Sequence, residues 1–172
     1  EVGPGPGALT RGLLMQGASR VVAVEMDHRC IEALNDVSKA YNGALTVFHG
    51  NALEIDECEL IGDTEDKDIH IIANLPYNVG TALLVKWMTA QKWKPWFSSL
   101  TLMFQKEVAD RIASEFNNSK YGRLSILSSW KLNVKKIIDI ILNLKNQKSA
   151  LTKESHQIQL DSLMKKVRTS AL

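Results

Sequence analysis

The segment EVGPGPGALT, residues 1–10, decides the fold of this 172-residue chain. Its glycines Gly3, Gly5 and Gly7 leave no side chains between the backbone and a ligand. Apolar residues within 9–14 recur at helical spacing and predict a helix that starts near Gly7. A glycine-rich turn that opens a helix is typical of a nucleotide cradle. The G-x-G-x-G spacing argues against a pyrophosphate ligand, and an ordinary strand-to-helix turn is the alternative.

An acid follows the next apolar run at the expected distance. Residues 21–24 are apolar and predict a strand that ends at Glu25. In doubly wound folds, an acid at the end of the second strand accepts hydrogen bonds from ribose hydroxyls, about 20 residues beyond the glycine-rich turn. Glu25 fits that spacing measured from Gly7. The loop and the acid together favour a nucleoside ligand over an ordinary turn.

The stretch Asn74-Leu75-Pro76-Tyr77 follows a short apolar run and precedes a helical pattern. The Asn74 side-chain oxygen and the Leu75 carbonyl can each accept a hydrogen bond from a planar amine, because Pro76 stiffens the turn around them. Tyr77 can stack on the attached ring. The stretch therefore predicts a clamp for an adenine N6 amine, although on its own it also fits a turn with an aromatic cap.

Strands and helices are predicted to alternate along the chain. Strands are expected to end near Val2, Glu25, Phe48 and Asn74, with a further strand at 100–104. Helical patterns fill the intervals, at 8–16, 28–41, 79–92 and 105–117. This alternation predicts an α/β, doubly wound, mainly parallel sheet with helices on both faces. Ligands of such folds bind at the carboxyl ends of the strands. The candidates at these ends are Gly3, Glu25, Asn51 and Asn74.

Composition suits a globular domain with an uneven charge distribution. The apolar fraction is 45% and the net charge is +2, which is small for a nucleic-acid binder. Residues 54–68 contain eight acids against Lys67 alone, and residues 145–172 contain six basic residues against two acids. We expect the acidic run to be a solvated loop without a metal, and its charge to keep RNA away from it.

Cysteines and histidines give no sign of a disulfide framework or a metal site. Cys30 and Cys58 lie far apart and indicate a reducing compartment. No zinc-type spacing links the four histidines, which are His28, His49, His70 and His156. No apolar run approaches transmembrane length and no signal peptide is visible, so we expect no membrane partner.

Together the motifs resemble those of the ribosomal RNA small-subunit adenine-N6,N6-dimethyltransferases, which use S-adenosylmethionine. The matching segments are EVGPGPGALT at 1–10, VVAVEMD at 21–27, GNALEID at 50–56, NLPYNVGTALL at 74–84, LMFQKEVADRI at 102–112 and YGRLS at 121–125. The last two segments make the resemblance specific, and it covers about residues 1–130. It implies a Rossmann-like class I S-adenosylmethionine-dependent methyltransferase domain at 1–133. A divergent basic tail whose start can form a helix follows at 134–172.

The resemblance assigns cofactor-binding roles. The three glycines would let the backbone approach the methionine part of S-adenosylmethionine, Glu25 would bind the ribose hydroxyls, and Asn74 would also contact the cofactor. Asn51 stands where the family has an Asp that hydrogen-bonds the cofactor's adenine. Loss of that charge predicts weaker binding by about 1 kcal/mol. Asn51 as a simple turn residue is the alternative. Met26 either packs on the adenine or belongs to the core.

Catalytic and RNA-binding roles follow by the same resemblance. The acceptors at Asn74 and Leu75 would give the target nitrogen a freer lone pair and aim it at the methyl group, with Pro76 shaping the turn and Tyr77 stacking on the base. The expected RNA contacts are Gln105, Arg111, Tyr121 and Arg123. A helix ion pair between Glu107 and Arg111 is the structural alternative for that segment.

The leading function is dimethylation of two adjacent adenines near the 3′ end of small-subunit (16S) ribosomal RNA, within a 30S precursor, by a monomer in the bacterial cytoplasm. One alternative is the related large-subunit (23S) adenine methyltransferases that confer macrolide resistance. The other is a catalytically silent relative that binds RNA or the ribosome. The family's upstream segment, its Phe-Pro-rich segment and its C-terminal helical domain are not recognisable here. We therefore expect the chain as given to be weak or inactive alone.

Overall fold

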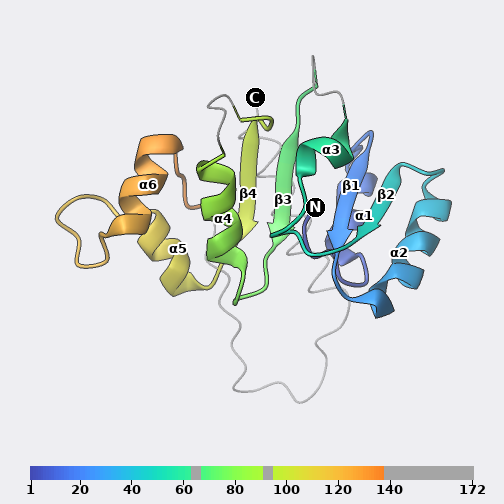
Figure 1. Cartoon of the computed structure of the whole chain (residues 1–172), viewed down its shortest axis with the longest axis horizontal. Helices are drawn as coiled ribbons and strands as arrows, with labels where there is room; N and C mark the ends of the chain where they lie inside the picture. Colours follow the sequence, from blue (N-terminus) through green and yellow to red (C-terminus); the bar gives the residue numbers. More distant parts are fainter. Residues whose placement is uncertain (63–66, 91–94, 138–172) are drawn as a thin grey trace. The chain divides into compact units, whose positions relative to one another are not determined.

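Short parallel strands alternate with helices through residues 1–62, 67–90 and 95–137, the part of the chain that the computed structural model describes. Residues 1–134 form one compact unit. Its elements, labelled in Figure 1, are α1 (Ala8–Met15), β1 (Val21–Glu25), α2 (His28–Ala40), β2 (Leu45–His49), α3 (Glu57–Ile61), β3 (His70–Asn74), α4 (Gly80–Met88), β4 (Ser99–Met103), α5 (Lys106–Ile112) and α6 (Arg123–Lys131).

The strands form two parallel pairs. β1 pairs with β2, and the last partners in register are Glu25 and His49. β3 pairs with β4, and there the last partners are Asn74 and Met103. All four arrows point the same way in Figure 1, so the carboxyl ends of the strands lie at one edge. The predicted α/β fold with parallel strands is confirmed.

A single apolar cluster connects the two strand pairs. Val2 forms a parallel bridge with Val24 on the side of β1 that faces away from β2. Both valines pack in one buried cluster with Ile71 and Ala73 of β3 and with Trp87 of α4. Burial of aliphatic and aromatic side chains is the main favourable contribution to folding, so this cluster holds the two pairs in one unit.

The described part of the acidic run is more ordered than the sequence predicts, and residues 63–66 of the run lie outside the described residues. A solvated loop was expected across 54–68, but Asp56 caps the short helix α3 by accepting a hydrogen bond from the Cys58 amide at 2.9 Å. Glu57 is buried and forms an ion pair with Lys86 at 2.9 Å. The prediction fails at Glu57 because its partner lies far away along the chain, where local charge patterning cannot show it.

A groove of about 620 Å³ lies between the facing sides of β1 and β3. Val21 and Val22 line one side of it, and Ile69 and Ile71 line the other. Val2 and Val24 also line the groove, whereas Gly3, Glu25 and Asn74 do not. The groove therefore does not include these predicted ligand residues.

The predicted tail falls largely outside the described residues. Residues 132–137 carry no helix or strand, and residues 138–172 are not described. The predicted division at 133 and 134 stays a prediction. Among the described residues, no helix is both long and apolar enough to cross a membrane.

Ser125 explains why the segments FQKEVADR and YGRLS occur together. Its hydroxyl donates to the Arg111 carbonyl at 2.6 Å, near the end of α5, and accepts from the Gly122 amide at 3.1 Å, at the start of α6. The side chain is buried, with only 1% of its surface exposed. One hydroxyl thus joins two helices whose apolar faces pack together.

Replacing Ser125 with alanine should lower the free energy of unfolding by about 1–2 kcal/mol, because two partly buried backbone groups lose their partner. Urea unfolding monitored by circular dichroism measures this loss. Ser129→Ala is the matched control, since Ser129 is exposed on the same helix and should change stability by less than about 0.5 kcal/mol. Equal effects of the two substitutions would contradict the role of Ser125.

Candidate active site

The glycine-rich loop between Val2 and α1 follows a left-handed backbone path. Gly3, Gly5 and Gly7 have φ values of 67°, 55° and 87°. Residues other than glycine rarely adopt such φ values, so this conformation requires glycine at the three positions. The Gly7 amide donates to the Pro4 carbonyl at 3.0 Å, which closes the turn directly before the helix. The predicted glycine-rich turn at the start of a helix is present.

The buried carboxylate of Glu25 holds this loop against the end of β1. One oxygen accepts a hydrogen bond from the Gly5 amide at 2.8 Å, and the other accepts from the Asp27 amide at 2.7 Å. Each carboxylate oxygen can accept a second hydrogen bond. Glu25 therefore fixes the loop while keeping capacity for hydroxyl donors, and its role toward a ribose stays a prediction.

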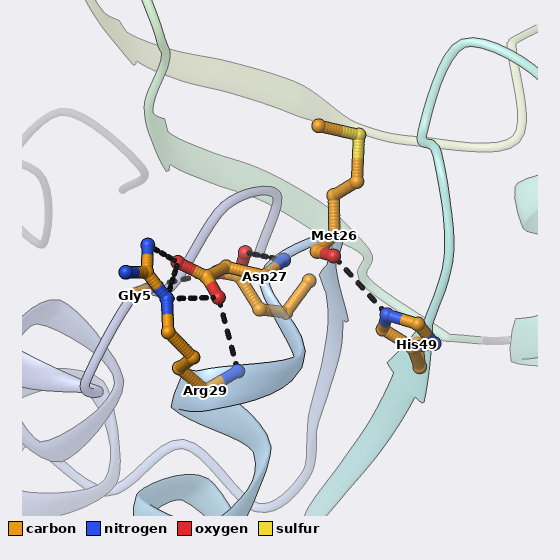
Figure 2. A network of polar contacts seen from close by, with 6 residues as sticks. Gly5, Met26, Asp27, Arg29 and His49 are labelled. Atoms are coloured by element: carbon orange, nitrogen blue, oxygen red, sulfur yellow. Dashed lines mark hydrogen bonds and ion pairs between the residues drawn. The ribbon is translucent and has the colours of Figure 1, made fainter.

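A second carboxylate orders the turn from β1 into α2. Asp27 accepts from the Arg29 amide at 3.0 Å and from the Arg29 guanidinium at 2.7–3.1 Å, as Figure 2 shows. These hydrogen bonds from Arg29 to the Asp27 carboxylate lower its pKa from 3.8 to about 2. Asp27 is thus ionised at neutral pH and keeps α2 in line with the strand that delivers Glu25.

The loop after β2 lies against the end of β1. The Gly50 amide donates to the Glu25 carbonyl at 2.9 Å, and the His49 ring nitrogen Nε2 contacts the Met26 carbonyl at 3.1 Å, which is visible in Figure 2. The Met26 side chain is 69% exposed, so the core alternative for this residue is wrong. An exposed methionine beside the loop is available to a ligand ring.

Asn51 shapes a tight turn within the same loop. Its Oδ1 accepts from the Leu53 amide at 3.1 Å, and its Nδ2 donates to Glu54 at 2.6 Å. Asn51 therefore acts as a turn residue, as the alternative from the sequence proposed. The remaining acceptor position on Oδ1 leaves a contact with an adenine amine as a prediction.

The predicted amine clamp lies directly beside the glycine loop. A β-carbon built on Gly3 would lie 3.7 Å from Cδ of Pro76. Leu75 is buried, whereas Tyr77 is 80% exposed and Asn74 is exposed at the end of β3. Among the described residues, the Asn74 side chain has no hydrogen-bond partner. A polar side chain and an aromatic ring thus remain available next to the loop.

Helix α4 starts from this clamp. The Pro76 carbonyl accepts from the amides of Val79 and Gly80 at 3.2 and 3.0 Å. A β-carbon on Gly80 would approach Cβ of Leu75 at 3.2 Å and the Phe104 ring at 3.1 Å. Glycine at this position therefore lets Leu75 sit close to the helix, which sets where its carbonyl lies.

The expected RNA-binding residues lie on or beside α5 and α6. Gln105 precedes α5, and Arg111 and Arg123 are exposed. Tyr121 is half-buried and meets the Phe116 ring edge-on at a centroid distance of 5.9 Å. No distance places these four residues in the site formed by the loop and the clamp, so their role toward RNA stays a prediction.

The ion pairs on α5 differ from the Glu107–Arg111 pair that was considered from the sequence. A pair between Glu107 and Arg111 was considered, but Asp110 accepts from Lys106 at 3.3 Å and from Lys120 at 2.7 Å. Among the described residues, Arg111 forms no ion pair. Arg111 is therefore available on the surface.

The remaining aromatic and metal-type residues add no second site. Trp87 is buried, Trp130 is 75% exposed, and Trp93 lies outside the described residues. Cys30 and Cys58 are free thiols. Within residues 1–62, 67–90 and 95–137, no group of three or more acidic, histidine or cysteine side chains is placed to hold a metal ion.

Sequence reasoning missed a polar cluster formed by Glu57, Lys86 and Trp87. Both Lys86 and Trp87 donate to the Glu57 carboxylate. Glu57 and Lys86 lie 29 residues apart, and no spacing rule connects them. In the sequence, Glu57 is one of eight acids in the run 54–68. Nothing in that run distinguishes it from an acid exposed to solvent.

Comparison with known proteins gives a clear family match. The family model described as "Ribosomal RNA adenine dimethylase" matches residues 1–168. A "Ribosomal RNA small subunit methyltransferase A" of Zymomonas mobilis subsp. mobilis is 56% identical over 135 residues, which cover 78% of this chain and 47% of that protein. The protein of the same name from Xanthobacter autotrophicus is 51% identical over 140 residues, which cover 81% of this chain and 48% of that protein. The chain spans about half the length of these relatives.

Replacing Gly3 with alanine should cost about 1 kcal/mol of stability because of its left-handed backbone. It should also weaken binding of S-adenosylmethionine about tenfold, since the added methyl enters the space between loop and clamp. Isothermal titration calorimetry measures the affinity and thermal unfolding measures the stability.

Gly43→Ala is the matched control for this prediction. Gly43 has a similar φ of 78°, and a β-carbon there would meet nothing within 4 Å. It should lose similar stability and keep its affinity. Equal affinities of the Gly3 and Gly43 variants would contradict the placement of the cofactor beside Gly3.

Proposed function

Because this chain belongs to the ribosomal RNA adenine dimethylase family, we propose that it transfers methyl groups from S-adenosylmethionine to the N6 amines of two adjacent adenines near the 3′ end of small-subunit ribosomal RNA. The two relatives described above carry the name of a small-subunit methyltransferase, which favours this substrate over large-subunit RNA. The 30S precursor particle is the proposed partner, and the protein is proposed to act as a monomer in the cytoplasm.

One observation carries the proposal: the glycine loop and the amine clamp are neighbours. Gly3 and Pro76 are far apart in sequence, yet a β-carbon on Gly3 would touch the Pro76 ring. A methyl donor held by the loop and an amine held by the clamp would share one space. Had the two segments lain on opposite sides of the unit, no direct transfer could occur.

The residues around this space fit S-adenosylmethionine. The left-handed loop presents backbone without side chains, and a β-carbon at Gly7 would approach Leu34 at 3.1 Å, so only glycine leaves that turn its close packing. We assign the methionine part of the cofactor to the loop and the ribose to Glu25. The adenine is assigned to Met26 and Asn51, which lie on adjoining loops.

The cofactor supplies a methyl group that is already activated by its positively charged sulfur, so the protein needs no strong base. The Asn74 side-chain oxygen and the Leu75 carbonyl each accept a hydrogen bond from one N–H of the target amine. Their acceptance withdraws the nitrogen lone pair from the ring and orients it toward the loop. Tyr77 stacks on the base and excludes water from one of its faces.

The same clamp can hold the amine after the first transfer. Transfer would form a nitrogen–carbon bond as the sulfur–methyl bond breaks, with S-adenosylhomocysteine as the leaving group and one N–H proton released to water. The monomethylated amine keeps one N–H, so one of the two acceptors stays engaged while the other side accommodates the new methyl group. The exposed position of Asn74 leaves room on that side. The two acceptors therefore support two successive transfers.

Gln105, Arg111, Tyr121 and Arg123 are proposed to contact the surrounding RNA.

Replacing Asn74 with alanine tests this assignment. The chain should bind S-adenosylmethionine in a calorimeter. Asn74→Ala should lower its methyl transfer to unmethylated small-subunit particles, which we expect to be slow already, about 100-fold, as expected when one positioned polar contact is lost. Its cofactor affinity should change less than its transfer rate. Failure of the unsubstituted chain to bind the cofactor, or methylation of large-subunit RNA instead, would overturn the proposal.

Tyr77 should matter through its ring alone. Tyr77→Ala should reduce kcat/KM for the RNA about 5- to 150-fold, because stacking on one base contributes about 1–3 kcal/mol. Tyr77→Phe keeps the ring and should retain most of the activity. Cofactor affinity should be unchanged in both variants. A phenylalanine variant as weak as the alanine variant would show that the hydroxyl, and not stacking, is required.

A further inference from the structure

Lys86 of α4 fastens the turn that follows β2. Its Nζ donates to the carbonyls of Ala52 at 2.8 Å and Ile55 at 2.5 Å, and to both carboxylate oxygens of Glu57 at 2.9 Å. All of these acceptors lie in one short segment between β2 and the start of α3. The Lys86 and Glu57 side chains are only 28% and 11% exposed. One partly buried cation therefore fixes the curvature of this turn.

Trp87 strengthens the same attachment. Its Nε1 donates to Glu57 at 2.9 Å, and its ring lies in the core cluster with Ile71 and Leu83. Two consecutive residues of α4 thus hold one carboxylate, from a charged and from a neutral donor. Glu57 cannot move away from α4 without losing both contacts.

The fastened turn is the one that carries Asn51. The amides of Leu53, Glu54 and Ile55 all donate to Asn51, at 3.1, 2.9 and 3.2 Å. The preceding residue, Gly50, donates to the Glu25 carbonyl at 2.9 Å. The position of Asn51 relative to Glu25 therefore depends on a turn whose outer carbonyls bind Lys86.

The other end of α4 belongs to the amine clamp. The Gly80 amide, at the first residue of the helix, donates to the Pro76 carbonyl at 3.0 Å. We propose that Lys86 is a positioning residue that sets the adenine-binding turn at a fixed place relative to the clamp, through one helix. The proposal rests on the proposed function, because it takes Asn51 as a cofactor contact.

Removal of the Lys86 charge should loosen the turn without unfolding the helix. Lys86→Met keeps an unbranched apolar stem of similar reach, but the two turn carbonyls lose their donor and Glu57 loses its counter-charge. Leu83 and Leu84 still bury the other side of α4. The Asn51 turn should therefore shift, while Tyr77 and the start of the helix stay in place.

Binding of S-adenosylhomocysteine, measured by calorimetry, tests this through a double-mutant cycle. Lys86→Met should raise Kd about tenfold. In an Asn51→Ala background it should raise Kd less than about threefold further, because both substitutions act through one turn. Lys39→Met is the control, since Lys39 pairs with Asp36 on the surface of α2 and should leave Kd unchanged. An unchanged Kd for Lys86→Met, or losses that multiply in the double variant, would overturn the proposal.

Hydrogen exchange of the ligand-free protein gives an independent readout. Lys86→Met should speed exchange of the Leu53, Glu54 and Ile55 amides at least tenfold, and leave the Gly3 amide, bonded to Val24 at 2.9 Å, unchanged. Equal exchange rates at the turn would also overturn the proposal. Should Lys86→Met fail to fold, Glu57→Gln keeps the side-chain shape and removes only the charge. Glu57→Gln should show the same effects at a smaller magnitude. Unchanged Kd and unchanged exchange rates in this variant would count against the proposal.

The experiment separates this inference from the proposed function. Absence of S-adenosylhomocysteine binding by the unsubstituted chain would defeat the proposed function and the inference together. Normal binding by the unsubstituted chain and by Lys86→Met, with weaker binding by Asn51→Ala, would defeat the inference alone. Weak binding by the Lys86 and Asn51 variants, without multiplication in the double variant, supports both.

Discussion

The Glu25 carboxylate is the contact on which the geometry of the site depends. It accepts the amides of Gly5 and Asp27, and so connects the glycine loop with the turn that leads into α2. Hydrogen bonds to an ionised acceptor are stronger than those between neutral groups. Without this carboxylate, a loop of left-handed glycines would have few constraints. With it, the loop is held at the end of β1, where the neighbouring strands also deliver their polar residues.

Parallel pairing extends this constraint to the rest of the edge. Because β1 and β2 run in register, Glu25 lies opposite His49, and the loop that follows reaches back to the Glu25 carbonyl. β3 delivers Asn74 to the same edge, and the apolar cluster around Val2 and Ile71 holds the second strand pair against the first. The closeness of Gly3 and Pro76 is the outcome of this packing.

Local patterns were sufficient to predict the strands, the helices α1, α2, α4 and α5 and the segments of the site, but they did not predict α3 or α6. Apolar runs that end in Glu25 and Asn74 mark strands, and the glycines before Ala8 mark a helix start, since each signal lies within a few residues of the feature that it specifies. Contacts between distant segments were beyond such rules. The burial of Glu57, the hydroxyl bridge of Ser125 and the pairing of Asp110 with Lys120 depend on partners brought together by folding. For Asn51, the local sequence explains the turn that it forms, whereas its contact with a cofactor stays a proposal.

The exposure of Tyr77 bears on how long the protein would retain its target. Its ring is 80% exposed, so few contacts hold it before the proposed stacking on a base. Stacking then restricts both partners, and the entropy lost offsets part of the attraction. A rigid, pre-packed ring would grip the base more tightly and release it more slowly. Under the proposed function, which requires the spent donor to be replaced between two transfers to one nitrogen, a loosely held base would shorten the dwell time of each intermediate.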